Sequence, residues 1–282
     1  MVDLKNRLLF RFAKKWIADR EMGGAIMAAK EANSEGKSVL LNRLGEDITD
    51  FDLTQKHFNE YLALEDSINQ NGIKGCVSIK LTQLGLLLDQ NLVRARVEKL
   101  AGRAEALGQL FWIDMESSAL TSKTLKLYTD IFKRHKNAGV AIQAYLRRSE
   151  DDLDELLEMG GRIRLVKGAY SEPRSLVYPD RREIAENYSK LMKILFERGE
   201  HFTIATHDSE LIDAAKRLSE SHRVDFQFAM LRGIRDDLKL ELVNSGYQVS
   251  DYLPFGDEWY SYAVRRIREH PSNMLLLARS LI

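Results

Sequence analysis

The sequence predicts an α/β fold, a TIM-type (βα)8 barrel with N-terminal helices before it and a final helix over its mouth. Eight short apolar or β-branched segments recur along the chain, and the residues between them place apolar side chains at helical spacing. From residue 38 to residue 247 these segments begin on average about 30 residues apart, the length of one strand and one crossover helix. Eight such units close most economically into a barrel, and an open doubly wound sheet is the second choice.

The chain begins with two segments of helical periodicity, at residues 3–19 and 23–35, and Gly36 ends the second. The first residues have neither a long apolar centre nor a small-residue cleavage site, so they do not resemble a secretory signal. We expect an amphipathic helix that packs on the barrel. No proline- or serine-rich linker is present, so we expect one domain over residues 1–282, with helices at 1–37 and the barrel at 38–282.

The eight predicted strands are short and rich in aliphatic residues. They lie at residues 38–42, 76–80, 110–115, 140–145, 163–167, 202–207, 224–228 and 247–252. Between strands, apolar groups recur three and four residues apart, and several such segments end at glycine, as helices do. The predicted helices are VRARVEKLAGRAEAL, KTLKLYTDIFKRHK, DDLDELLEMG, REIAENYSKLMKILFERG, ELIDAAKRLSE and IRDDLKLELVNSG.

The composition excludes several classes of function. Lys and Arg together number 42, as do Asp and Glu, so no excess positive charge exists to hold a nucleic acid backbone. Cys76 is the single cysteine, which prevents an internal disulfide and favours a reducing compartment. No apolar run approaches the roughly 18 residues of a membrane span. We therefore expect a cytoplasmic globular protein.

Polar residues collect where the predicted strands end, and in a barrel of this kind reactive groups lie at the carboxyl ends of strands. One lysine or tyrosine at such an end is usually a surface group, but a convergent set favours an active site. The set consists of Lys80, Asp114, Gln143, Tyr145, Arg164, Lys167, Thr206, His207 and Tyr252.

The last predicted helix carries two adjacent arginines, Arg265 and Arg266, with Glu269 at ion-pair spacing from both. A solvated charged face is the ordinary interpretation of this pattern. The helix, however, follows the eighth strand after a turn at residues 254–256, so its arginines can lie over the barrel mouth and bind a carboxylate.

Other chemistry has little support in the sequence. His207 has no HxH, HxxE or HExxH partner, so we expect no metal site. The glycine-rich nucleotide loops and the GxSxG motif are absent, which argues against those nucleotide sites and against serine hydrolase chemistry.

Several motifs, taken together and in order, resemble the flavin-dependent proline dehydrogenases, particularly the short monofunctional bacterial kind. The resemblance extends from about residue 38 to about residue 273, and RLVKGAY with the final YxPxG and RRxxE is its most specific part. The matching segments are SIKLTQLGL (78–86), WIDMESS (112–118), IQAYLRRS (142–149), RLVKGAYSEP (164–173), ATHD (205–208), FAMLRGI (228–234) and YLPFGDEWYSYAVRRIRE (252–269).

The resemblance implies FAD held without a covalent bond and oxidation of L-proline to 1-pyrroline-5-carboxylate by hydride transfer to the flavin. It places Asp114 and Arg164 at the catalytic positions. The implied substrate-binding residues are Lys80, Tyr170, Leu231, Tyr252, Tyr262, Arg265 and Arg266. The implied cofactor-binding residues are Met115, Gln143, Arg164, Val166, Lys167, Gly168, Thr206, His207 and Glu269.

The resemblance also implies partners. Electrons pass to a quinone, the product passes to a pyrroline-carboxylate dehydrogenase, and contact with the inner face of a membrane is at most peripheral. Two local departures concern flavin contacts: the first strand reads VLLNRLGE, without an acidic-aromatic pair, and Ala229 and Arg232 replace a polar and an aromatic residue.

Two other functions remain open at this point. A Schiff-base aldolase or lyase could use Lys80 or Lys167 at a strand end as the amine nucleophile. Alternatively, the barrel binds an amino acid without catalysis.

Overall fold

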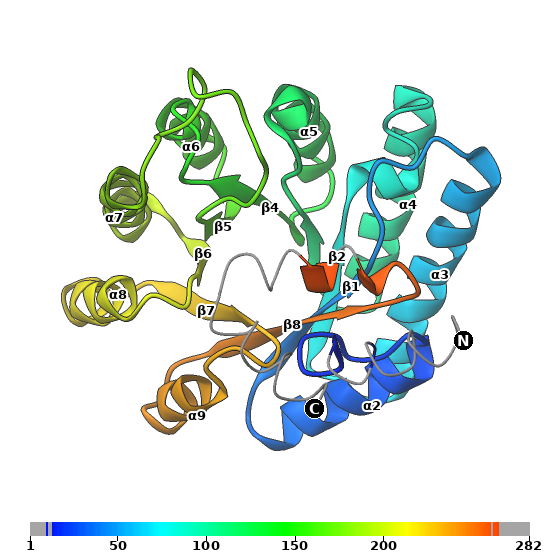
Figure 1. Ribbon diagram of the computed structural model, residues 1–282, viewed down its shortest axis with the longest axis horizontal. Coiled ribbons are helices and arrows are strands. Elements are labelled where there is room, and N and C mark those ends of the chain that lie inside the picture. The colour runs from blue at the N-terminus through cyan, green and yellow to red at the C-terminus, as the bar shows by residue number, and fades with distance from the viewer. Residues whose placement is uncertain (1–9, 11–12, 261, 265–282) are drawn as a thin grey trace, which may run out of the picture.

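The computed structural model describes residues 10, 13–260 and 262–264. Eight parallel strands form a closed barrel in sequence order, and the last strand pairs with the first (Figure 1). The strands are β1 (Ser38–Arg43), β2 (Gly75–Ile79), β3 (Phe111–Ile113), β4 (Ala138–Gln143), β5 (Arg162–Val166), β6 (His201–Ala205), β7 (Asp225–Leu231) and β8 (Val249–Phe255). The predicted barrel is confirmed, and the open sheet is excluded.

Helices surround the barrel (Figure 1). They are α2 (Met22–Ser34), α3 (Phe51–Gln70), α4 (Gln90–Ala106), α5 (Ser118–Phe132), α6 (Ser149–Glu158), α7 (Arg181–Arg198), α8 (Ser209–Ser221) and α9 (Asp236–Asn244), with the short 3-10 helix η1 (Leu81–Leu84) after β2. Helix α3 joins β1 to β2 and is not among the helices predicted above. Four helices begin after an aspartate whose carboxylate accepts first-turn N–H groups, which stabilises these starts. These residues are Asp50, Asp89, Asp180 and Asp208.

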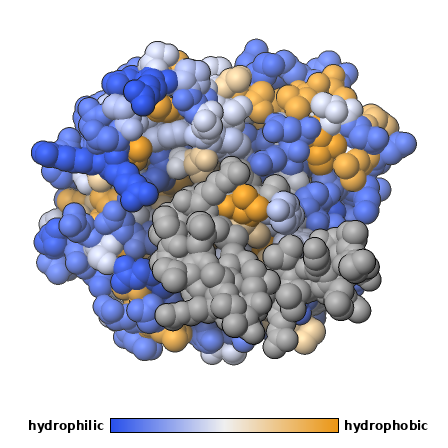
Figure 2. Space-filling model, viewed as in Figure 1, coloured by the Kyte–Doolittle hydropathy of each residue, from blue (hydrophilic) through white to orange (hydrophobic). Residues whose placement is uncertain are grey.

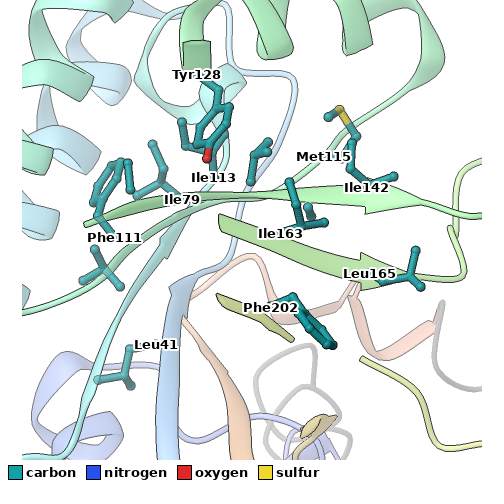
Figure 3. Close-up of a cluster of buried hydrophobic side chains, with 14 of the residues drawn as sticks. Leu41, Ile79, Phe111, Ile113, Met115, Tyr128, Ile142, Ile163, Leu165 and Phe202 are labelled. Carbon is teal, nitrogen blue, oxygen red and sulfur yellow. The ribbon is translucent and has the colours of Figure 1, made fainter. Parts of the chain in front are cut away.

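Alternate side chains of the strands enter two different cores, because successive residues of a strand point to opposite faces. One face packs against the helices: Figure 3 shows Leu41, Ile79, Phe111, Ile163 and Leu165 of the strands in one buried cluster with Tyr128 of α5. The other face forms a separate cluster within the barrel, made by Leu40, Cys76, Trp112 and Ala229. Residues of this inner face at the carboxyl ends of the strands therefore meet at the barrel mouth.

The end of β8 differs from the prediction. The strand continues past residue 252, and Pro254 and Phe255 pair with Asn42 and Arg43 of β1. The predicted turn at 254–256 is therefore wrong in its first two positions, and the chain turns at Gly256, whose φ is 128°. Pro254 has no N–H to donate to the sheet, and its carbonyl accepts a hydrogen bond of 2.8 Å from the N–H of Ala18, which precedes α2.

The N-terminal segment packs against the start of the final helix. Residues 14–16 form a turn and residues 17–19 are not helical, so the prediction of a helix over 3–19 is wrong at its C-terminal end, and its beginning lies outside the described residues. Trp16 and Ile17 are buried in one cluster with Trp259, and the rings of Phe10 and Trp259 lie 5.2 Å apart. The chain is helical at 259–260 and 262–264, immediately after β8.

The second predicted helix, 23–35, is confirmed as α2.

The surface over α7 and α8 is largely hydrophilic (Figure 2). Within residues 13–260, no helix is both long and apolar enough to cross a bilayer.

Candidate active site

Asp114, directly after β3, lies at the centre of a buried polar cluster at the barrel mouth. Its Oδ1 accepts a hydrogen bond of 2.7 Å from the Ser78 hydroxyl, and its Oδ2 accepts one of 2.7 Å from the Tyr252 hydroxyl. Arg164 Nη2 forms an ion pair with Oδ1 and donates a hydrogen bond of 3.1 Å to Ser78. These side chains come from β2, β5 and β8 and converge because all three strands end at the same rim.

Arg164 lies close to two aromatic rings inside the barrel. Its guanidinium carbon is 5.1 Å from the centre of the Trp112 ring and 5.8 Å from that of Tyr252, distances at which cation–π attraction operates. The side chain is buried. The rings and Asp114 therefore hold the guanidinium in one orientation.

Lys80 and Tyr170 lie beside this cluster. Lys80 Nζ is 3.9 Å from the Asp114 carboxylate and 4.0 Å from that of Glu46, and it donates a hydrogen bond of 3.3 Å to the Tyr170 hydroxyl. Tyr170 in turn donates a hydrogen bond of 3.0 Å to Glu46. The structure thus brings together three predicted substrate-binding residues, Lys80, Tyr170 and Tyr252, and the predicted catalytic pair.

The charges of this cluster stabilise one another. Burial opposes ionisation of Asp114, but Arg164 and Lys80 outweigh it and lower the pKa of this carboxyl below its usual value. Burial likewise opposes the charged form of Lys80, but Tyr170 and nearby carboxylates raise the pKa of its ammonium. Burial and the charge of Asp114 raise the pKa of Tyr252 well above the ordinary value. At neutral pH the cluster therefore contains a carboxylate, an ammonium and a neutral phenol.

A second group of predicted residues lies at the ends of β4, β5 and β6. Lys167 donates a hydrogen bond of 2.8 Å to Asp208, and Gln143 donates one of 3.3 Å to the carbonyl of Met115. The hydroxyl of Thr206 accepts the N–H of Asp208 at 3.2 Å. Val166 is the last residue of β5. These contacts fix one side of the rim.

His207 follows β6, and its ring contacts the end of β7. Its Nε2 accepts a hydrogen bond of 2.8 Å from the N–H of Leu231, so a neutral imidazole carries its proton on Nδ1. This bond joins a predicted cofactor residue to a predicted substrate residue.

The final helix is only partly described. Tyr262 is buried in the cluster of Trp259 and is close enough to Tyr252 to raise its pKa further. Arg265, Arg266 and Glu269 lie outside the described residues.

The sequence prediction did not include three groups that the structure places in the cluster: Ser78, Trp112 and Glu46. Ser78 lies two residues before Lys80 and Trp112 two residues before Asp114, so strand alternation from a predicted residue was a usable signal for both. Glu46 lies in a loop after β1, where no periodicity applies.

The comparisons with known proteins all indicate one family. A family model described as proline dehydrogenase matches residues 25–278. Proline dehydrogenase 2 of Bacillus subtilis (strain 168) is 34% identical over 282 residues, covering 96% of this chain and 93% of that protein. The proline dehydrogenase of Deinococcus radiodurans is 32% identical over 287 residues, covering 99% of this chain and 93% of that protein.

A solved structure is similar in fold. Proline utilization A from Bdellovibrio bacteriovorus, inactivated by N-propargylglycine, superposes with a TM-score of 0.84 at 23% identity. The match covers 91% of this chain but 32% of that longer chain. The family model covers most of the present sequence, and both bacterial relatives exceed 30% identity along almost its full length, so this chain belongs to the proline dehydrogenase family.

Proposed function

We propose that the protein oxidises L-proline to 1-pyrroline-5-carboxylate, the first step of proline catabolism, with non-covalently bound FAD. The observation that carries the proposal is the buried cluster of Asp114, Arg164, Tyr252 and Lys80 at the barrel mouth. Membership of the family and the names of its bacterial relatives support it.

Substrate binding requires that a zwitterionic amino acid leave water. This is favourable only where the carboxylate meets fixed cations. Lys80 is one such cation, held charged by its surroundings, and we assign Arg265 and Arg266 as the other two on the RRxxE motif. We assign the contacts with the pyrrolidine ring to Tyr170, Leu231, Tyr252 and Tyr262.

The residues present fit a flavin. Within the described part of the chain, Arg164 Nη1 and Gln143 Oε1 are buried without a hydrogen-bond partner, which costs free energy unless a ligand supplies one. One is a donor and the other an acceptor, and a flavin ring presents both carbonyls and an N–H. We assign to the flavin site Met115, Gln143, Arg164, Val166, Lys167, Gly168, Thr206, His207 and Glu269.

A flavin bound by these residues would supply the redox chemistry, taking up the hydride that L-proline loses at C5. The protein positions the ring carbon and excludes water from it. Arg164 places a fixed positive charge in the site, oriented by Asp114 and two aromatic rings, and this charge stabilises negative charge that develops during the reaction. Asp114 orients the Tyr252 hydroxyl by accepting a hydrogen bond from it.

The Schiff-base alternative is disfavoured by the state of Lys80. An amine nucleophile must lose its proton, whereas the surroundings of Lys80 raise its pKa. The Lys167 ammonium donates to Asp208. Borohydride reduction in the presence of carbonyl compounds tests this alternative directly, since only a Schiff base gives a covalent adduct.

The electron acceptor that we propose is a quinone, with the product passing to a pyrroline-carboxylate dehydrogenase. To test the function, purified protein is incubated with L-proline and a soluble quinone, and the product is identified by mass spectrometry. We expect proline to lose two hydrogen atoms, in equal amount to the quinone reduced. Binding of L-proline without turnover would favour the non-catalytic alternative.

A further inference from the structure

Lys239 of α9 is a fully buried lysine on the outer side of the barrel wall. Its relative exposure is 0%, and its ammonium donates three hydrogen bonds. The acceptors are the carbonyl of Leu231 at 2.8 Å, Asp236 at 2.7 Å and Asp251 at 2.7 Å. An ammonium has three N–H groups, so each is used.

Two of these acceptors adjoin residues that we assign to the substrate ring. The carbonyl bound by Lys239 belongs to Leu231 itself, and Asp251 precedes Tyr252 in β8. Leu231 and Tyr252 are paired in the register of β7 and β8. By strand alternation the Leu231 side chain lies on the inner face, because Met230 packs in the outer core and Ala229 in the inner cluster, and Tyr252 itself packs against that inner cluster.

The main chain of Leu231 is held on both sides. Its N–H donates to His207 at 2.8 Å, and its carbonyl accepts from Lys239. The next N–H along the chain, that of Arg232, donates to the carbonyl of Tyr252 at 3.1 Å. Leu231 is the last residue of β7, so these bonds determine where the strand end stands relative to Tyr252.

We propose that Lys239 is a positioning residue for the substrate pocket: by joining the carbonyl of Leu231 to Asp251, it fixes the spacing between Leu231 and Tyr252 and so the ring size that the pocket accepts. The inference rests on the proposed function. A fully buried charge is costly in free energy, and an apolar side chain would fill the same volume if packing were the only requirement.

The chain offers a matched control. Lys37 is also buried and lies 3.8 Å from the other carboxylate oxygen of Asp251, and it pairs with Glu35 at 2.5 Å. Within the described residues it forms ion pairs with Glu35 and Asp251 and no hydrogen bond to Leu231, and it lies outside the proposed pocket. If the loss of any cation beside Asp251 is enough to alter activity, Lys37→Met and Lys239→Met will both show the effect. An effect of positioning Leu231 will appear only in Lys239→Met.

The test compares wild type, Lys239→Met, Lys239→Arg and Lys37→Met, each with its flavin content measured. Substrates are L-proline and its six-membered homologue, L-pipecolate. We expect Lys239→Met to raise KM for L-proline about tenfold with a smaller change in kcat, and to reduce the discrimination against L-pipecolate. Lys239→Arg should restore part of the wild-type KM and part of the discrimination against L-pipecolate. Lys37→Met should leave each of these two quantities within about twofold of wild type.

Equal effects of Lys239→Met and Lys37→Met, or unchanged ring discrimination in Lys239→Met, would overturn the inference. If Lys239→Met does not fold, the double variant Lys239→Met/Asp251→Asn removes the carboxylate that has lost its nearer cation. Its KM and ring discrimination are then compared with those of Asp251→Asn alone. Failure of the proposed function is separate, because the wild-type protein would then not oxidise L-proline at all.

Discussion

Asp114 links three strands of the barrel through one carboxylate. It accepts hydrogen bonds from Ser78 and Tyr252 and pairs with Arg164. Its lowered pKa keeps it charged at neutral pH, and together with Glu46, 4.0 Å from Lys80, it offsets the positive charges of Arg164 and Lys80. At the scale of single residues, the charges of the candidate site balance one another, and a zwitterionic substrate brings no net charge to them.

Tyr252 is expected to exclude substituents on the substrate ring. Tyr252→Ser removes the ring beside the proposed pocket and should lower kcat/KM for L-proline while raising the ratio of activity on 4-hydroxyproline to activity on L-proline. Tyr252→Phe keeps the ring and loses only the bond to Asp114, so its ratio should stay near that of wild type. An unchanged ratio in Tyr252→Ser would remove this residue from the pocket.

Arg265 is expected to bind the substrate carboxylate. Arg265→Met leaves that charge underpaired in a closed site, which costs roughly 2 to 5 kcal/mol, or about 30- to several-thousand-fold in kcat/KM. FAD content should remain that of wild type. The control is Arg217→Met, an exposed residue of α8. A value of kcat/KM for Arg265→Met equal to that of the control would contradict the assignment.

At the scale of elements, the loop after β5 and helix α3 depend on particular residues. Gly168 has φ of 103°, and a Cβ added there would meet the Tyr145 ring at 2.1 Å. In α3, Glu65 is fully buried, and its carboxylate has no hydrogen-bond partner within residues 13–260. Both positions tolerate little change, for steric reasons in the first and electrostatic ones in the second.

Gly168→Ala should displace the loop that follows β5. The alanine is strained at positive φ and collides with Tyr145, so Lys167 and Val166 should move with it. We expect loss of stability of at least about 1 kcal/mol and a reduced flavin content per protein. Gly160→Ala is the control, because it also has positive φ, 71°, but no atom within 4 Å of its added Cβ. Equal flavin content in the two variants would argue against a role of this loop in cofactor binding.

Glu65→Gln should change how stability depends on pH. Burial raises the pKa of Glu65 from 4.5 to about 9, so between these values the folded protein binds a proton that the unfolded chain has released. The contribution of the Glu65 proton to the free energy of unfolding is complete below the unfolded pKa of 4.5 and is lost as pH rises towards 9. The free energy of unfolding therefore falls by at most about 1.4 kcal/mol per pH unit in this range. Glutamine does not titrate.

Urea unfolding at several pH values from 5 to 9 checks this expectation. The variant should gain free energy of unfolding relative to wild type as pH rises. Glu186→Gln, at an exposed position of α7, should show no such trend. Parallel pH profiles of wild type and Glu65→Gln would mean that Glu65 is ionised in the folded state.

At the scale of the whole molecule, the barrel was predictable because eight strand and helix units recur at nearly constant spacing. Helix α3 was not, since buried polar residues, Thr54, His57 and Glu65, interrupt its apolar face. The end of β8 was misjudged because proline normally marks a turn. The local sequence pattern therefore predicted the order of the elements correctly, and the residues at which they end less accurately.

The candidate site was predictable where a polar residue directly follows a strand, as at Lys80 and Asp114. It was not predictable where a side chain acts through a contact that only the fold creates. Glu46 meets Tyr170 from a loop far away in sequence, and Lys239 reaches Leu231 from behind the barrel wall. Such contacts depend on how loops and helices pack onto the strands, which no spacing pattern in the sequence shows.

We propose that L-proline reduces a flavin bound in this barrel. The visible absorption spectrum of the purified protein, recorded anaerobically before and after addition of L-proline, tests it most directly. We expect the band of an oxidised flavin before addition, its loss after L-proline, and its persistence after D-proline or buffer. A colourless protein that binds no added FAD, or a flavin band that L-proline leaves unchanged, would contradict the account.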